Sequence, residues 1–237
     1  SLYGGSPGQG GSIIQIYGSN NILSGNTIQG EDYGITMIDG MANFICNNTI
    51  SGSLNGISIS DSDMNQIYGN FITENEEAGI LITVINTDCQ NLIFNNYLKN
   101  LNNIVFSANS PSCSWNIESG MGPNIIGGPR IGGNYWGAPD GTGVSDLALD
   151  EDNDGFADEP YEIDAQNIDY YPLVHFTSPP EYGIYYLNST VLNNETTRYI
   201  IDQPGTYLFD EDIIDLEFPC DTSGTFSEGY PLIWVRS

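Results

Sequence analysis

Short runs of alternating apolar and polar residues recur along the first half of the chain at a nearly constant interval. Four segments align without gaps, and each reads Asn-x-Ile/Leu-x-x-Asn-x-Ile/Leu: NILSGNTI from Asn21, NFICNNTI from Asn43, NQIYGNFI from Asn65 and NLIFNNYL from Asn91. A second apolar motif follows each copy: GITMI at Gly34, GISIS at Gly56, GILIT at Gly79 and NIVFS at Asn103. A degraded fifth copy, NIIGGPRIGGN, begins at Asn124.

The step of 22 residues between the first copies predicts the fold class. It is too short for repeats of helix pairs and is typical of one coil of a parallel β-helix. Side chains alternate across a strand, so equivalent apolar residues should stack about 4.8 Å apart in rows. One row would be Leu23, Ile45, Ile67 and Ile93, and another Ile28, Ile50, Ile72 and Leu98. The repeated asparagines would form similar rows, each amide bonding the next coil. An antiparallel β-sandwich with Asn-rich turns is the alternative.

These motifs resemble the repeats of right-handed parallel β-helix proteins. That group includes pectate-lyase-like enzymes and the carbohydrate-binding and sugar-hydrolase repeats of archaeal and bacterial cell surfaces. The resemblance covers about residues 12–137. It implies an all-β, right-handed parallel β-helix, and it is specific for the fold but says little about function.

A Gly-Asn-Tyr-Trp block follows the repeats. GGNYWGAPDG, residues 132–141, precedes the acidic stretch DEDNDGFADEPYEIDAQNIDYYPL, residues 150–173. The order resembles the segment that closes such a β-helix in archaeal surface proteins. An exposed last coil must be covered, and we expect a cap built from Tyr135, Trp136, Tyr161, Tyr170 and Tyr171, with a sugar-stacking platform as the alternative. We therefore predict a β-helix over 1–137, an acidic-loop cap over 138–175, and a linker with a small β-rich C-terminal segment over 176–237.

The acidic loop has the spacing of calcium ligands. Asp150, Asp152 and Asp154 occupy positions 1, 3 and 5, the Phe156 carbonyl position 7 and Asp158 position 9. Position 12 is not Glu, so the loop is not an EF-hand. Close carboxylates repel one another unless a cation lies between them. The sequence thus predicts a structural Ca²⁺ site, and a solvated acidic turn is the alternative.

The charge balance excludes several classes of partner. Four Lys and Arg against 31 Asp and Glu give a net charge of −27. Without a basic patch we expect no nucleic-acid binding and no attraction to an anionic membrane surface. No apolar run reaches about 18 residues, so direct membrane insertion is not expected. The chain starts at Ser1 without a signal peptide, so we expect a mature form or a fragment.

The acidic, Lys-poor composition and three Asn-x-Ser/Thr sequons, at Asn47, Asn188 and Asn194, favour an extracellular, cell-surface glycoprotein. Cys89 and Cys113 lie 24 residues apart, about one coil, which favours a disulfide between neighbouring coils. Cys46 follows an inward Ile45 and should face outward or lie at a corner. The pairing of Cys46 and Cys220 stays open.

Catalytic residues are weakly indicated, and we expect no enzymatic activity. Polysaccharide lyases of this fold use an Arg or Lys base beside calcium, and neither Lys99 nor Arg130 lies in such a motif. Glycosidases need two carboxylates across a cleft. Asp39 and Asp61 should stack on adjacent coils and are weak candidates, as are Glu31, Asp32, Glu74 and Glu77. The single histidine, His175, has no nucleophile motif before it.

The chain ends suggest assembly. PGTYLFDEDI, residues 204–213, resembles the start of a new β-helix, and the last strand would expose an edge at Leu232, Ile233, Trp234 and Val235. The first coil, Ser12–Tyr17, would expose another edge, and open edges favour end-to-end self-association. We therefore predict a structural protein of a surface layer, sheath or filament. The alternatives are a carbohydrate-binding β-helix module that contacts cell-surface glycans, which an exposed aromatic row would favour, and a polysaccharide hydrolase or lyase.

Overall fold

The computed structural model describes residues 10–83, 88–107, 111–152 and 154–175, with Asp88 and Cys89 described in the backbone alone. It also describes the backbone of five short strands outside these ranges. The chain divides into two compact units, Ser1–Phe176 and Thr177–Ser237, which are considered separately.

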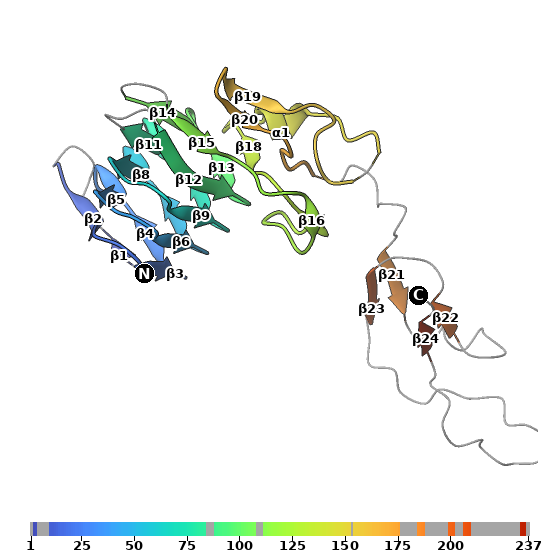
Figure 1. Ribbon diagram of the computed structural model, residues 1–237. Coiled ribbons are helices and arrows are strands. Elements are labelled where there is room, and N and C mark those ends of the chain that lie inside the picture. The colour runs from blue at the N-terminus through green and yellow to red at the C-terminus, as the bar shows by residue number, and fades with distance from the viewer. Residues whose placement is uncertain are drawn as a thin grey trace, which may run out of the picture. The chain divides into compact units, whose positions relative to one another are not determined.

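The first unit is a right-handed parallel β-helix with three sheets (Figure 1), which confirms the predicted fold. Sheet A contains β1 (Leu2–Tyr3), β4 (Thr27–Gln29), β7 (Thr49–Ser51), β10 (Phe71–Thr73), β13 (Tyr97–Lys99) and β18 (Tyr135–Gly137). Sheet B contains β2 (Ser12–Tyr17), β5 (Tyr33–Ile38), β8 (Asn55–Ser60), β11 (Ala78–Thr83) and β14 (Ile104–Phe106). Sheet C contains β3 (Ile22–Ser24), β6 (Phe44–Cys46), β9 (Gln66–Tyr68), β12 (Asp88–Phe94) and β15 (Ser112–Ser114). Each coil passes through sheets B, C and A in turn.

The predicted apolar rows form the core. In sheet A, Ile28, Ile50, Ile72, Leu98 and Trp136 lie directly over one another. In sheet C, Ile45, Ile67 and Ile93 are in register and fully buried. The inward residues of each coil are large and apolar, and each coil buries them against those of the next coil.

The asparagines form ladders at the corners between sheets. In the ladder between sheets C and A, the backbone N–H of each Asn donates to Oδ1 of the Asn in the following coil, at 3.0–3.1 Å: Asn26 to Asn48, Asn48 to Asn70, Asn70 to Asn96 and Asn96 to Asn134. A ladder between sheets B and C joins Asn21, Asn43, Asn65 and Asn91 in the same way. Corner backbone groups that would be buried without partners are thereby satisfied.

The predicted position of the fifth repeat copy is wrong. Residues from Asn124 do not form a coil strand; they lie in a hairpin of β16 (Gly120–Met121) and β17 (Arg130–Ile131). The last coil instead uses β14, β15 and β18, and Asn134 continues the ladder. Two glycines and a proline, Gly127, Gly128 and Pro129, suit a hairpin better than a strand.

Residues 138–175, called here the post-coil segment, follow the last coil. They contain α1 (Val144–Leu147) and an antiparallel pair, β19 (Tyr161–Asp164) and β20 (Asn167–Asp169). α1 packs on β18, and β20 packs on β15. Trp136 contacts Trp115 and Tyr161, with ring centroids 5.8 and 5.0 Å apart. An acidic-loop cap as such stays a prediction. Within the described residues, no helix has the length and apolar composition needed to cross a membrane.

The second unit contains two parallel strand pairs whose backbone is described. β21 (Ile184–Leu187) pairs with β23 (Thr206–Phe209), and β22 (Tyr199–Ile201) pairs with β24 (Ile233–Val235). Ile184 lies opposite Thr206, 22 residues later, which is the step of the first unit. The predicted assembly edge thus includes a strand that already has one partner, Leu232 lies outside the described residues, and self-association stays a prediction.

Candidate functional site

The outer face of sheet A carries two parallel rows of side chains, called here the sheet A face. One row is Thr27, Thr49, Phe71, Tyr97 and Tyr135, and the other is Gln29, Ser51, Thr73 and Lys99. These residues alternate with the buried central row, so the strand period turns them outward. The face therefore offers hydroxyls and an amide over its first coils and aromatic rings over its later ones.

The aromatic rings of this face stack along the helix axis. Ring centroids of Phe71 and Tyr97 are 5.5 Å apart, and those of Tyr97 and Tyr135 are 4.7 Å apart and nearly parallel. Tyr135 is buried, whereas Phe71 remains 41% exposed. On the side of Phe71 that faces the first coils, the in-register neighbour is the short side chain of Thr49. The row thus ends in a ring with an accessible side.

The buried end of the row is fixed by hydrogen bonds. The Tyr135 hydroxyl donates to Asp146 Oδ1 at 2.7 Å. Burial raises the pKa of Tyr135, and this hydrogen bond raises it further. Burial alone would raise the pKa of Asp146. Hydrogen bonds from the Ala138 N–H, the Tyr135 hydroxyl and the Gly143 N–H lower it overall. The tyrosine therefore stays neutral and immobile, which suits a support better than a reacting group.

Sequence reasoning missed this row, although a signal was present. Each outward residue of the row directly follows an asparagine of the ladder between sheets C and A, from Asn26 to Asn134. The repeat alignment alone therefore places Thr, Thr, Phe, Tyr and Tyr over one another. The prediction assigned Tyr135 and Trp136 to a cap. In the structure Trp136 belongs to the inward row and Tyr135 to the outward one.

The ladder between sheets C and A ends on a buried carboxylate that the sequence analysis also missed. Asp169 Oδ2 accepts from the backbone N–H of Asn134 and from Trp136 Nε1, both at 2.8 Å, and Oδ1 accepts from the Tyr171 N–H at 3.0 Å. The residue is completely buried, and burial raises its pKa to about 6 despite these bonds. A Cβ on Gly133 would clash with Asp169 Oδ1, so the glycine makes room for the carboxylate.

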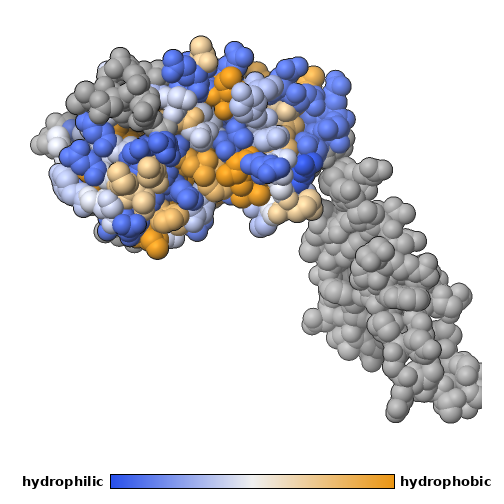
Figure 2. Space-filling model, in the orientation of Figure 1, coloured by the Kyte–Doolittle hydropathy of each residue, from blue (hydrophilic) through white to orange (hydrophobic). Residues whose placement is uncertain are grey.

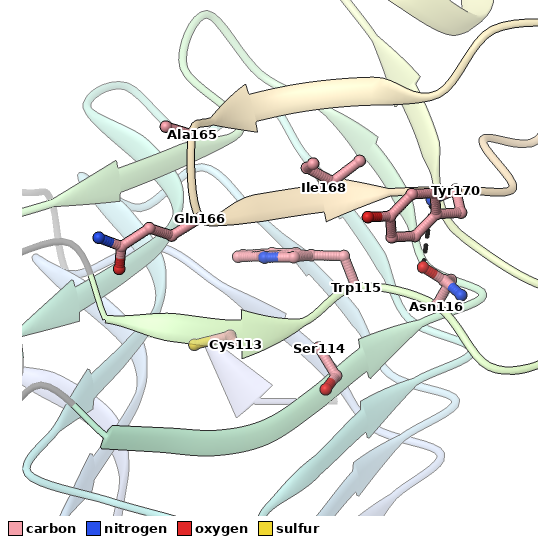
Figure 3. A pocket seen from close by; sticks show the side chains of 8 residues that line it. All are labelled: Cys113, Ser114, Trp115, Asn116, Ala165, Gln166, Ile168 and Tyr170. Carbon is pink, nitrogen blue, oxygen red and sulfur yellow. Dashed lines mark hydrogen bonds between the residues drawn. The ribbon is translucent and has the colours of Figure 1, made fainter.

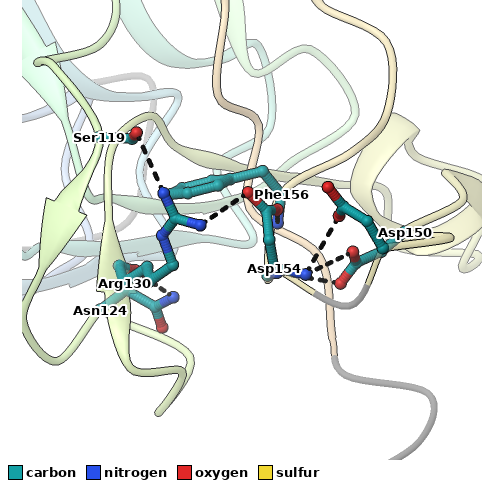
Figure 4. Close-up of polar contacts among 8 residues, drawn as sticks. Ser119, Asn124, Arg130, Asp150, Asp154 and Phe156 are labelled. Carbon is teal, nitrogen blue, oxygen red and sulfur yellow. Dashed lines mark hydrogen bonds and ion pairs between the residues drawn. The ribbon is translucent and has the colours of Figure 1, made fainter. Parts of the chain in front are cut away.

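The predicted metal ligands separate into two groups. Asp150, Asp152 and Asp158 have carboxylate oxygens within 4.8 Å of one another. Asp154 instead pairs with Arg130 at 3.0 Å, and the guanidinium also lies over the Phe156 ring, 5.3 Å from its centroid (Figure 4). The loop is closed further by N–H groups of Asp154 and Gly155, which donate to Asp150. A cation from the β16–β17 hairpin thus balances part of the loop's charge.

Burial raises the pKa of Asp150, and the neighbouring carboxylates of Asp154 and Asp152 raise it further, while the two loop N–H groups lower it. The predicted fourth ligand, the Phe156 backbone, lies in a bridge with Leu173. The loop therefore remains a cluster of carboxylates with an arginine at its side.

The weak catalytic candidates lie as expected on adjacent coils. The N–H of Asp39 bonds the Ser60 carbonyl, and the N–H of Asp61 bonds the Thr83 carbonyl, so both follow sheet B at one corner. Both have positive φ angles, 50° and 44°, and they are turn residues. The expectation of no enzymatic activity stays a prediction.

The cysteine and glycosylation predictions are only partly covered by the described residues. Cys113 is disulfide-bonded. Asp88 lies opposite Ser112, and the register between the two strands shifts after Asp88. The Cys89 side chain lies outside the described residues, so that pairing stays a prediction. Cys46 is a free thiol in the outward row of sheet C, yet it is buried. Asn47 is an exposed corner residue, whereas Asn188 and Asn194 lie outside the described residues.

Hydrophobic residues are also exposed away from the sheet A face. On the face seen in Figure 2 they gather over the middle of the solenoid, among hydrophilic residues. On sheet C, Ile22 is 73% exposed, while Phe44 and Leu92 in the same row are half-buried. The row continues through Gln66 to Ser114, so unlike the sheet A face it carries a single aromatic ring and a single hydroxyl.

Comparison with known proteins assigns the family. A family model described as periplasmic copper-binding protein (NosD) matches residues 8–141, more than half of the chain. No curated protein and no solved structure matches the chain. The chain therefore belongs to the NosD family, and the periplasmic description of that family places it outside the cytoplasm.

This assignment corrects the predicted cofactor. The family is described as copper-binding, so the expectation of structural calcium is wrong. The acidic loop also lies beyond the matched residues.

The matched segment offers copper no imidazole ligand. Copper favours imidazole, thiolate and thioether ligands. The matched segment contains no histidine, and His175 is the only one in the chain. Among the described residues, the ligand group that the structure assembles from His, Cys, Asp and Glu is made of carboxylates alone.

Proposed function

We propose that this NosD-family protein is a non-enzymatic β-helix of the cell exterior that binds a neutral glycan along the sheet A face. The observation that carries the proposal is the aromatic row of that face, which ends in the exposed ring of Phe71 beside hydroxyl and amide side chains. The resemblance to carbohydrate-binding β-helix repeats supports the same ligand class.

The chemistry of the face suits a sugar polymer. An aromatic ring packs against the apolar side of a sugar ring, while neighbouring hydroxyls and amides bond its hydroxyl groups. Hydroxyl side chains lie beside Phe71 on its own strand and on the neighbouring one: Thr73, Thr49 and Ser51. Their side chains can both donate and accept hydrogen bonds.

The charge of the chain favours a neutral ligand. The net charge of −27 repels anionic polymers at long range. The sheet A face itself has one charged side chain, Lys99, in its described rows. The rows also extend over successive coils, so a glycan chain can cross several of them and gain affinity from repeated weak contacts.

Affinity electrophoresis through gels that contain neutral polysaccharides tests this proposal. We expect a glucan, mannan or galactan to retard the wild-type protein, and Phe71→Ala to weaken that retardation at least tenfold, which corresponds to about 1.4 kcal/mol. Acidic polysaccharides should have no effect.

The matched control is Ile22→Ala, which removes an exposed apolar side chain from sheet C and should leave retardation unchanged. Circular dichroism confirms that both variants fold. Retardation of Phe71→Ala equal to that of wild type would contradict the proposal, as would the absence of retardation by every neutral polymer.

End-to-end assembly into a surface layer, sheath or filament is a second candidate. It is supported by the strand edges of the second unit, where β22 and β24 form a sheet of only two described strands. Each strand of a pair keeps one edge that can accept another strand. Electron microscopy of purified protein tests it: filaments or sheets would support assembly, and compact monomers at all concentrations would contradict it.

A further inference from the structure

A cavity of about 410 Å³ lies between the end of the solenoid and the post-coil segment (Figure 3). One wall is formed by β15 and the two residues after it, and the other by the β19–β20 hairpin and Tyr170. Its volume lies within the range of about 300–1,000 Å³ that is usual for small-ligand sites. Neither the sheet A face nor the acidic loop contributes to it.

The two walls are held together by hydrogen bonds. Cys113 N–H and Trp115 Nε1 both donate to Asn167 Oδ1, at 3.0 and 2.9 Å. The N–H of Tyr170 donates to Asn116 Oδ1 at 3.1 Å. The cavity is therefore formed before any ligand arrives, and binding requires little ordering of the protein.

The lining is unusual for so acidic a chain. None of the eight lining residues carries a charge, although the chain has 31 acidic residues. Ser114, Gln166 and Tyr170 place a hydroxyl, a carboxamide and a phenol at the surface, where all three residues are exposed. The half-buried Ile168 supplies apolar area beside them, and Trp115 lies buried behind the lining. An ionic ligand would find no counter-charge here.

We infer that this cavity binds a single neutral sugar residue, such as the end unit of a glycan chain. A sugar has hydroxyl groups that both donate and accept, which matches Ser114 and Gln166. Its apolar side can pack on the ring of Tyr170, which is 57% exposed. The inference rests on the proposed function for its ligand class, but it concerns a separate site with its own residues.

Titration calorimetry with glucose, galactose, mannose and N-acetylglucosamine tests this site. We expect saturable binding of at least one of these sugars, a loss of affinity of at least tenfold in Tyr170→Ala and in Gln166→Ala, and no binding of glucuronate. Tyr17→Ala is the matched control, because Tyr17 is 64% exposed on sheet B, and its affinity should equal that of wild type.

The two glycan sites are distinguished by crossing the variants. Phe71→Ala should keep the binding of single sugars while it loses retardation by polymers, and Tyr170→Ala should show the reverse. Absence of saturable binding of all four neutral sugars would overturn the inference, as would unchanged affinity in Tyr170→Ala. Neither result bears on retardation through Phe71, so each proposal can fail alone.

Discussion

The coils of the solenoid and the post-coil segment are stabilised in different ways. In the coils, an Asn inside a ladder makes the same contacts as its counterpart one coil away, for instance Asn48 and Asn70. In the post-coil segment, the contacts are unique: Asp169 accepts the last ladder hydrogen bond, and Arg130 holds Asp154. Stability is thus distributed over repeats in one region and concentrated in single residues in the other.

The point where the two regions meet shows how a repeat can end. A ladder of amides needs an acceptor beyond its last member, and Asp169 supplies an oxygen where the next coil would have placed an Asn. The same carboxylate also accepts from Trp136, whose ring fills the last position of the inward row. One residue therefore completes both the polar ladder and the apolar row.

Removal of a ladder asparagine should have the largest effect on the free energy of unfolding. Asn70→Ala removes the acceptor of the Asn48 N–H and of Asn48 Nδ2, both at 3.0 Å inside the protein. Asn48 Nδ2 still donates to the Leu23 and Cys46 carbonyls, so the Asn48 N–H is the group left unpaired, which should lower the free energy of unfolding by about 3 kcal/mol. Asn48→Ala should cost the same within about 1 kcal/mol, because its contacts are equivalent. Urea unfolding measures both values.

Asn21→Ala is the control for this series. Asn21 is exposed at the first coil, and it donates to Asn43 without accepting a described ladder bond. Its replacement should cost less than about 1 kcal/mol. A similarly small cost for Asn70→Ala would mean that the ladders do not carry the stability of the coils.

The titration of Asp169 should have the next largest effect on the free energy of unfolding. Its pKa is about 6 in the folded protein and 3.8 ordinarily, so between these values the folded state holds a proton that the unfolded state has lost. The free energy of unfolding therefore falls as pH rises from 3.8 to about 6, by at most about 3 kcal/mol, and the contribution is constant outside that window.

The difference between wild type and Asp169→Asn, measured by urea unfolding at pH 4 and pH 7, isolates this residue from the other carboxylates. In Asp169→Asn, the free energy of unfolding should lack the fall with pH that Asp169 causes in the wild type. A second measurement needs no variant: the NMR signal of the Trp136 Nε1–H should shift with a midpoint near pH 6, because it donates to Asp169. Equal slopes together with a midpoint near 4 would contradict the assignment.

Loss of the arginine contact should have the smallest effect. Arg130 and Asp154 are each about one-third exposed, at 34% and 30%, so solvent screens their attraction. Arg130→Gln should lower the free energy of unfolding by about 1 kcal/mol or less. Arg130→Lys keeps the charge but loses the planar contact with Phe156, and we expect an intermediate value. A loss of several kcal/mol would show that the loop depends on Arg130 alone.

Much of the solenoid could be predicted from the sequence because its information is repeated. Four aligned copies place Ile28, Ile50 and Ile72 in one row, and the parallel register follows from that alignment. Each position of the coil is specified several times over. The same alignment contains the outward row that ends at Phe71, but its residues change from Thr to Phe and Tyr along the row, so they form no repeated pattern.

The junction could not be predicted because its contacts occur once and join distant segments. Asp169 lies 35 residues after its partner Asn134, and no spacing rule links them. Arg130 reaches Asp154 from a hairpin that the repeat pattern assigned to a coil. The calcium prediction failed because the family is described as copper-binding, and the spacing of carboxylates does not reveal which metal a family binds.

The most direct test of the proposed function is an NMR chemical-shift map of the labelled protein during titration with a neutral oligosaccharide that retards it in gels. The account predicts that the shifting signals belong to Thr49, Phe71, Thr73 and their neighbours on sheet A. Shifts confined to sheets B and C, or no shifts at saturating sugar, would contradict it.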